Sequence, residues 1–212
     1  MRSGLVRPGK IVCVGRNYVE HAAELGNVVP ERPLLFLKPP SAVIDDGEPI
    51  VLPRESRRVE HEGEIGVVIG ARLRSCSEVD ALSAVAGVTC VNDVTARDLQ
   101  KSDGQWTRAK GFDTFCPLGP RVVPLGELAS LDDLEVVCRV NGAERQRGRA
   151  ADMAFSIPQL LAYISAVMTL EPGDLVATGT PAGVGPLAGG DVVEVEIPGV
   201  GVLTNPVVTA PA

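Results

Sequence analysis

The sequence is poor in aromatic side chains and has no surplus of positive charge. Phe, Trp and Tyr make up 3% of its 212 residues, so aliphatic side chains must build most of the core. The net charge of −7 disfavours sequence-independent binding to nucleic acid and adsorption to anionic membranes, because both need a basic surface. No apolar run approaches the roughly 18 residues that span a bilayer, and residues 1–10 lack the apolar core of a secretory signal. We therefore expect a cytoplasmic protein without nucleic-acid or membrane partners.

The cysteines give no sign of a disulfide framework. There are five of them, an odd number, and no two have the C-x-x-C spacing. They stand at positions Cys13, Cys76, Cys90, Cys116 and Cys138. We expect all five to be reduced and mostly buried, as is usual in a cytosolic protein.

Glycine and proline are abundant, at 23 and 17 residues, close to one residue in five. Such frequent turn residues favour many short strands over a helical bundle. The patterns predict strands at 10–14, 64–69 and 85–91, and hairpins at 134–146 and 192–204 around Asn141-Gly142 and Pro198-Gly199. They predict helices at 18–25, 95–101 and 155–170, and an extended loop at 30–40. We expect one mainly β domain with a few helices (α+β) over residues 1–212, and not a doubly wound fold.

Three acidic residues alternate just before an apolar strand. In a strand, Glu60, Glu62 and Glu64 would share one face and His61 would point the other way. Carboxylates gathered on one face suit a hard cation such as Mg²⁺ or Mn²⁺. The alternative is a solvated acidic edge, and spacing alone does not select the ligands among the three.

A second polar group follows the apolar strand at 85–91. Asp93 is either a helix N-cap or a metal ligand. Arg97 and Gln100 lie three residues apart, so on a helix they share a face that suits a small carboxylate. The alternative for this pair is an ordinary polar helix face.

Two further segments carry groups with catalytic chemistry. His21 and Glu24 lie three apart on the first predicted helix, where the carboxylate could orient the imidazole as a general base; the alternative is a surface ion pair. Lys110 lies in a loop beside Gly111, where a lysine is usually solvated. The small and rigid residues at 178–185 let the backbone approach a ligand closely, although they form neither a Walker A loop nor a dinucleotide fingerprint.

In their order along the chain, these motifs resemble the fumarylacetoacetate hydrolase family, in particular its short acylpyruvate-hydrolase-like members. The likeness rests on Gly15-Arg16-Asn17-Tyr18, on His21 and Glu24, on 33–40, Glu62-Gly63-Glu64, 92–100, 105–117, Phe155-Ser156-Ile157, 170–174 and 178–185. The family fold is a mixed β-roll, usually in a homodimer. Longer members carry an N-terminal segment before the Gly-Arg-Asn-Tyr motif, and we expect this chain to lack it.

The resemblance implies a role for each matching position. Glu62, Glu64 and Asp93 would bind the metal, Mg²⁺ or Mn²⁺, and Glu60 would not. His21 and Glu24, on a lid helix, would act in catalysis together with Lys110. The implied substrate-binding residues are Arg16, Arg97, Gln100, Lys110 and Thr180.

The implied activity is hydrolysis of a small 2,4-dioxo acid. The enzyme would cleave an acylpyruvate or fumarylpyruvate into pyruvate and a carboxylic acid, with His21 activating the water. One alternative is decarboxylation or tautomerisation of oxaloacetate at the same metal site, since these reactions use the same enolate. A second is a module that binds a dicarboxylate without catalysis.

Overall fold

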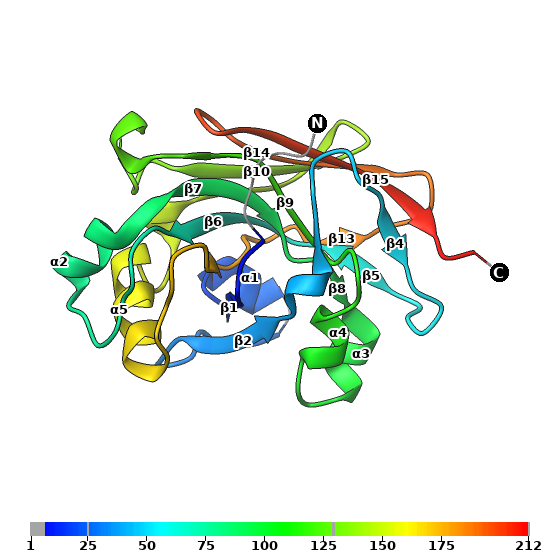
Figure 1. Ribbon diagram of the computed structural model, residues 1–212. Coiled ribbons are helices and arrows are strands. Elements are labelled where there is room, and N and C mark those ends of the chain that lie inside the picture. The colour runs from blue at the N-terminus through cyan, green and yellow to red at the C-terminus, as the bar shows by residue number, and fades with distance from the viewer. Residues whose placement is uncertain (1–6, 25, 129, 212) are drawn as a thin grey trace.

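The computed structural model describes residues 7–24, 26–128 and 130–211, and strands dominate it (Figure 1). The largest of its sheets has seven strands in the order β2-β1-β12-β6-β7-β9-β3. Their bounds are β2 (Leu34–Lys38), β1 (Ile11–Gly15), β12 (Leu175–Ala177), β6 (Gly63–Ile69), β7 (Val85–Asn92), β9 (Cys116–Val123) and β3 (Val43–Ile44). β6 and β7 are buried along most of their length, as their apolar runs predict. The mainly β fold class is thus confirmed.

A five-stranded sheet covers one side of the large sheet (Figure 1). Its order is β11 (Ala143–Arg149), β10 (Glu135–Val140), β14 (Val192–Ile197), β15 (Gly201–Thr209) and β4 (Ile50–Leu52). Both predicted hairpins are confirmed as β10–β11 and β14–β15. The first turns at Asn141 and Gly142, whose φ angles of 53° and 76° suit a tight two-residue turn. β15 runs five residues past the predicted end at 204 because its last residues pair with β4.

Short elements connect these sheets. A three-stranded sheet has the order β13 (Gly185–Pro186), β5 (Val59–His61) and β8 (Thr95–Ala96). The α-helices are α1 (Val19–Glu24), α2 (Glu78–Ala81), α3 (Arg97–Ser102), α4 (Thr107–Lys110) and α5 (Ile157–Val167). The 3₁₀ turns are η1 (Pro40–Ala42), η2 (Leu82–Ala84), η3 (Leu125–Glu127) and η4 (Ala150–Asp152). None of the helices in the described ranges is long and apolar enough to cross a membrane.

Helix α5 is the predicted amphipathic helix, shortened by two or three residues at each end. Ser156 and Gln159 form a capping box at its start. Ile157, Leu160 and Ile164 are buried and join the main hydrophobic cluster. The five cysteines are free and all but Cys76 are buried, which confirms the prediction of reduced thiols.

Two predicted elements are wrong in part. The segment 30–40 was expected to be a loop, but its apolar residues form β2, which pairs antiparallel with β1 at the edge of the large sheet. The flanking Pro33 and Pro39 lie outside the strand, where they cost no ladder hydrogen bond. The helix expected from residue 95 begins at Arg97, because Thr95 and Ala96 pair with β5. The first helix ends at Glu24 among the described residues, and Leu25 lies outside them.

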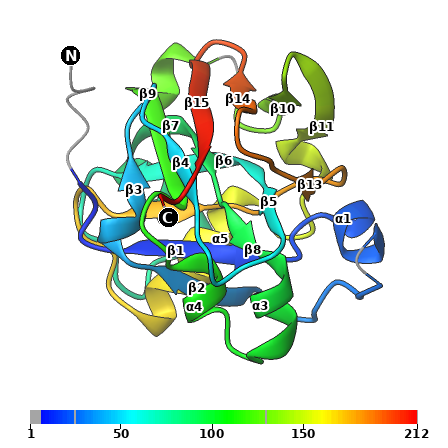
Figure 2. The same cartoon turned by 90° about the vertical axis from the view of Figure 1, so that its right-hand side faces the viewer.

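These elements converge at one end of the large sheet. Helices α3 and α4 pack against β8, and α4 also packs against β2. Figure 2 shows α3 and α4 on one side of β8 and α1 on the other. The space between these helices is the place where the polar motifs meet.

Candidate metal centre and active site

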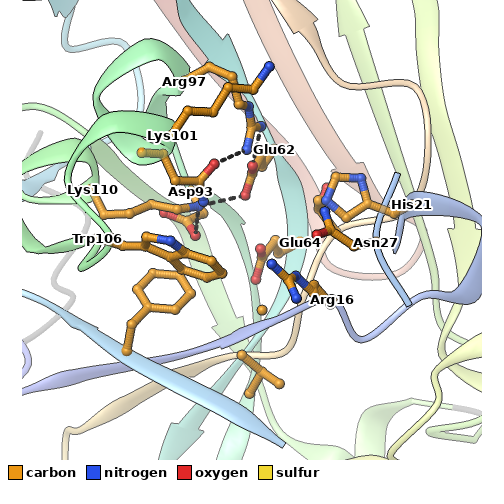
Figure 3. Close-up of a pocket in the computed structure, with 16 residues that line it drawn as sticks. Arg16, His21, Asn27, Glu62, Glu64, Asp93, Arg97, Lys101, Trp106 and Lys110 are labelled. Atoms are coloured by element: carbon orange, nitrogen blue, oxygen red, sulfur yellow. Dashed lines mark hydrogen bonds and ion pairs between the residues drawn. The ribbon is translucent and has the colours of Figure 1, made fainter. Parts of the chain in front are cut away.

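A cavity of about 350 Å³ lies between α1, α3, α4 and the ends of β1 and β6 (Figure 3). Nine of the sequence-predicted site residues line it: Arg16, His21, Glu62, Glu64, Asp93, Arg97, Gln100, Lys110 and Thr180. The tenth, Glu24, contacts it through His21. The structure thus brings together groups that are up to about 160 positions apart in the sequence.

Three carboxylates converge on the floor of this cavity. One oxygen each of Glu62, Glu64 and Asp93 lies within 4.8 Å of the others, and all three side chains are buried. Sheet pairing explains how residues 30 positions apart meet: β6 and β7 are antiparallel, with Gly63 opposite Asn92. The Asn92 carboxamide oxygen accepts the Glu62 N–H at 3.0 Å, and the Glu62 carbonyl accepts the Asp93 N–H at 2.8 Å. These two hydrogen bonds therefore fix the ends of β6 and β7 that carry the carboxylates.

The structure bears on the alternatives left open at Asp93 and Glu60. Asp93 does not cap a helix, because α3 begins at Arg97 with Ala96 before it. The Glu60 carboxylate accepts hydrogen bonds from Arg58 and Arg97 and does not line the cavity. His61 points away, as the strand alternation predicts, with its Nδ1 3.0 Å from Gln146 Oε1.

Buried cations surround the three carboxylates. Lys110 Nζ lies 2.7 Å from Glu62 Oε2 and 2.7 Å from Asp93 Oδ2, so it bridges two of them. Lys38 Nζ donates to the other Asp93 oxygen at 2.5 Å and to the Val94 carbonyl at 3.0 Å. The Arg97 guanidinium contacts Glu62 and Glu60, and its Nη1 lies 2.5 Å from Gln100 Oε1. The expectation that Lys110 is solvated in a loop is wrong, since it ends α4 and is 2% exposed.

The charges set opposite pKa shifts on neighbouring carboxyls. Burial and the negative charges of Asp93 and Glu62 hold the pKa of Glu64 well above its ordinary value. Burial acts the same way on Glu62, but Lys110 and Arg97 more than offset it and lower the pKa of that carboxyl. Among the three carboxylates, the negative charge of Glu64 is thus the least compensated by protein cations. Its Oε2 accepts a hydrogen bond from the Gly179 N–H at 2.8 Å.

The donor set fits a hard divalent cation. Mg²⁺ and Mn²⁺ prefer carboxylate oxygens, and several negative charges without full compensation favour a cation between them. The like-charge repulsion that raises the pKa of Glu64 is the kind of interaction that a bound cation relieves. The acidic cluster could therefore hold a metal ion.

His21 faces the cavity from α1. It is 5% exposed, and its Nδ1 lies 3.4 Å from Glu24 Oε2, so the pair predicted from spacing is formed, between a buried imidazole and an exposed carboxylate. Glu24 in turn accepts the Gly183 N–H at 3.1 Å, which ties α1 to the glycine-rich 178–185 segment. Burial lowers the pKa of His21 despite its acidic neighbours, so the imidazole is neutral near pH 7. A neutral, oriented imidazole is the form that accepts a proton.

Thr180 is held by the protein and not by solvent. Its hydroxyl donates to the Gly63 carbonyl at 2.9 Å and accepts from Gln146 Nε2 at 2.7 Å. Gln146 also accepts the Gly63 N–H at 3.0 Å, so one buried amide from β11 braces both the start of β6, between Glu62 and Glu64, and Thr180.

Sequence reasoning missed five residues of the cavity or its frame. They are Asn27, Phe36, Lys38, Lys101 and Trp106. Lys38 ends strand β2, which was expected to be a loop, so the sequence held no local signal for it. Phe36 and Trp106 pack edge to face with ring centroids 5.2 Å apart and form an apolar wall. The two rings are far apart in the sequence, so the sequence alone did not predict this contact.

Comparison with known proteins gives the family. Residues 10–208 match the model of the fumarylacetoacetate (FAA) hydrolase C-terminal domain. The chain belongs to the fumarylacetoacetate hydrolase family. It is 45% identical over 195 residues to the mitochondrial oxaloacetate decarboxylase of Dictyostelium discoideum, covering 90% of this chain and 89% of that one. It is 46% identical over 189 residues to the mitochondrial oxaloacetate tautomerase of Caenorhabditis elegans, covering 87% and 88%.

Solved structures of this family share the fold. The crystal structure of 2-hydroxyhepta-2,4-diene-1,7-dioate isomerase from Mycobacterium marinum matches with a TM-score of 0.89 at 47% identity. The match covers 98% of this chain and 77% of that one. The mixed β-roll implied by the motif resemblance is therefore confirmed.

Proposed function

We propose that the chain is a divalent-metal-dependent enzyme that processes a small 2-oxo dicarboxylic acid through an enolate, with oxaloacetate as the substrate. The observation that carries this proposal is the convergence of three buried carboxylates within 4.8 Å, beside Lys110 and His21, in one cavity. The relatives support the substrate class, since one is an oxaloacetate decarboxylase and another an oxaloacetate tautomerase.

In this proposal Glu62, Glu64 and Asp93 bind the cation, Mg²⁺ or Mn²⁺. When bound, the cation supplies Lewis-acid charge that stabilises an enolate. The residues belong to a single catalytic domain, which we propose is cytoplasmic and works as a homodimer.

The side chains around the cluster then supply proton transfer and orientation. His21, neutral and oriented by Glu24, removes or returns the proton at C3 of the substrate. Lys110 keeps positive charge next to the site where the enolate oxygen develops. Arg16, Arg97, Gln100 and Thr180 line the remaining wall and orient the substrate carboxylates.

Tautomerisation and decarboxylation differ in which bond breaks. In tautomerisation His21 takes a proton from C3, the C–H electron pair moves toward the 2-oxo oxygen, and that oxygen takes a proton from solvent to give the enol, while His21 returns its proton to solvent. In decarboxylation the C3–C4 bond breaks, CO₂ leaves with neither electron of the bond, and the resulting pyruvate enolate takes a proton at C3. Both need a group that transfers a proton at C3, which is the position we assign to His21.

Hydrolysis of an acylpyruvate is the second candidate. The pairing of buried His21 with the exposed Glu24 favours it, because a neutral, oriented imidazole can activate water as well as move a carbon-bound proton. A module that only binds a dicarboxylate is the weaker hypothesis, because binding alone does not require a buried base such as His21.

The test compares substrates on one enzyme preparation. Purified protein with Mg²⁺ would be given oxaloacetate and acetylpyruvate in parallel. Enol and keto forms are followed by ultraviolet absorbance and pyruvate by lactate dehydrogenase. Spontaneous metal-catalysed decay is subtracted with the Glu64→Gln variant. We expect turnover of oxaloacetate that needs Mg²⁺ and falls in His21→Ala. Turnover of acetylpyruvate alone would establish the hydrolase instead, and no turnover of either would disprove the proposal.

A further inference from the structure

The cavity contains cations of two kinds. Lys110 and Arg97 are buried and hydrogen-bonded to the carboxylates of the candidate metal cluster and its neighbour. Lys101 and Arg16 also line the cavity, but neither makes an ion pair with any carboxylate in the described part of the chain. Lys101 and Arg16 are therefore two cations in the cavity that could form ion pairs with a negatively charged ligand.

Lys101 reaches the cavity because of its place on α3. It lies four residues after Arg97, one helical turn on, so both side chains project from the same face. Figure 3 draws the two side by side at one edge of the cavity. Lys101 is exposed, whereas Arg97 is 3% exposed, so Lys101 stands at the mouth and Arg97 inside.

The acidic residues nearest to Lys101 in the sequence are occupied elsewhere. Asp98 accepts from Ser56 Oγ at 2.6 Å and from the Arg57 N–H at 2.9 Å. Asp103 binds the Arg108 guanidinium at 2.6 Å and 2.7 Å. Lys101 consequently has no local anion to neutralise it, although it is placed beside a site built for anionic substrates.

We propose that Lys101 is a specificity-determining residue that binds the second carboxylate of a 2-oxo dicarboxylic acid at the mouth of the cavity. This inference rests on the proposed function and names the feature of its substrate that the site selects. A 2-oxo monoacid has one carboxylate, for which the interior groups suffice. A diacid carries a second charge that must lie away from the cluster of carboxylates, where Lys101 is the exposed cation.

Arg16 provides the contrast within the same cavity. Its backbone is held in the left-handed region, at φ 59°, by the neighbouring Asn17, whose carboxamide donates to the Thr178 and Phe155 carbonyls. Figure 3 draws Arg16 beside Glu64 and away from Lys101, and Arg16 is half-buried where Lys101 is exposed. A cation beside the carboxylate cluster serves monoacids and diacids alike.

The experiment compares a diacid and a monoacid on matched variants. Lys101→Met, Lys101→Arg and Arg16→Met are measured with Mg²⁺ and either oxaloacetate or acetylpyruvate. Arg108→Met removes one exposed positive charge from α4 outside the cavity and is the control. For Lys101→Met we expect the ratio of kcat/KM for diacid over monoacid to fall about 2- to 5-fold, as for loss of one exposed charge contact, mostly through KM. Lys101→Arg should restore the ratio, and Arg16→Met should lower both values together.

Direct binding separates this inference from the proposed reaction. Calorimetry with Mg²⁺ and two unreactive probes, 2-oxoglutarate as the diacid and 2-oxobutyrate as the monoacid, needs no turnover. Wild-type protein should prefer the diacid, and Lys101→Met should lose that preference. If the diacid binds in this way but nothing is turned over, the proposed function fails and the role of Lys101 stands. The role of Lys101 would be overturned if Lys101→Met weakened binding of both probes equally, or if Arg108→Met had as large an effect as Lys101→Met.

Discussion

Lys38 and Asp93 form a fully buried ion pair on the side of the carboxylate cluster opposite Lys110. The Lys38 ammonium lies 2.5 Å from Asp93 Oδ1 and its side chain has no exposed surface. Asp93 is therefore held by a lysine on each oxygen, with Lys110 on Oδ2. Such a pair orients a carboxylate for a cation and carries a large penalty if it is broken.

Loss of Lys38 should weaken both the fold and metal binding. In Lys38→Met, Asp93 keeps only Lys110, and we expect a loss of about 3–5 kcal/mol in the free energy of unfolding, as for a broken buried ion pair. Mg²⁺ affinity should fall roughly 10- to 100-fold, as for removal of groups that orient metal ligands. Urea denaturation and calorimetry measure these two effects. Arg147→Met, which breaks an exposed pair on β11, is the control, and an equal loss there would contradict the account.

Glu64→Gln should have opposite effects on metal-free and metal-loaded protein. It removes one of three like charges while an amide oxygen can still accept the Gly179 N–H. We expect the metal-free protein to gain about 1 kcal/mol, or roughly 2–4 °C in Tm. The stabilisation by Mg²⁺ should disappear. Thermal melting with and without Mg²⁺ checks both, and an unchanged metal-induced rise in Tm would show that Glu64 is not a ligand.

His21 should set the acid side of the pH profile. Burial lowers its pKa below the ordinary 6.5, so the imidazole stays neutral as the pH falls toward that value. Since the base acts in its neutral form, kcat/KM should be flat near pH 7 and decline only below the ordinary imidazole pKa of 6.5. Glu24 raises the pKa of His21, so Glu24→Gln should move the decline to lower pH.

The His21→Ala variant completes this test. We expect turnover to fall about 10²- to 10⁴-fold while Mg²⁺ binding stays intact, as for loss of a general base. The decline on the acid side should also vanish from the residual activity. An unchanged pH profile in His21→Ala would assign that ionisation to another group.

The single tryptophan of the chain should report on the cavity. Trp106 lines it, and a Cβ added at Gly15 would lie 2.7 Å from the indole ring, closer than a side chain allows. In Gly15→Ala we expect the indole to move toward the cavity, with a several-fold rise in KM and a shifted fluorescence maximum. Gly126→Ala, where nothing lies within 4 Å of the added carbon, is the control. If both variants behave like wild type, Trp106 does not form the wall.

The sequence predicted the elements with strong local patterns and missed those defined by distant contacts. The hairpin at Asn141-Gly142 and helix α5 were predicted because turn chemistry and 3.6-residue periodicity are local. Strand β2 was missed because the prolines around it are typical of a loop, and only pairing with β1 reveals it.

The candidate site shows the same division. Spacing alone kept Glu60, Glu62 and Glu64 as equals, because alternation in one strand does not show that Arg97 engages Glu60. The motif resemblance selected Glu62, Glu64 and Asp93, and the structure brings these three together. Lys38 and Trp106 were out of reach, since nothing local distinguishes a buried lysine or a cavity-lining ring from an exposed one.

The most direct test of the account is a crystal structure of the protein grown or soaked with Mn²⁺ and measured at the manganese absorption edge. The account predicts one anomalous peak per chain, about 2.0–2.3 Å from an oxygen of each of Glu62, Glu64 and Asp93. Crystals of Asp93→Asn should lack that peak. A cavity without anomalous density, or a peak bound by other residues, would contradict the claim that these three carboxylates form the metal site.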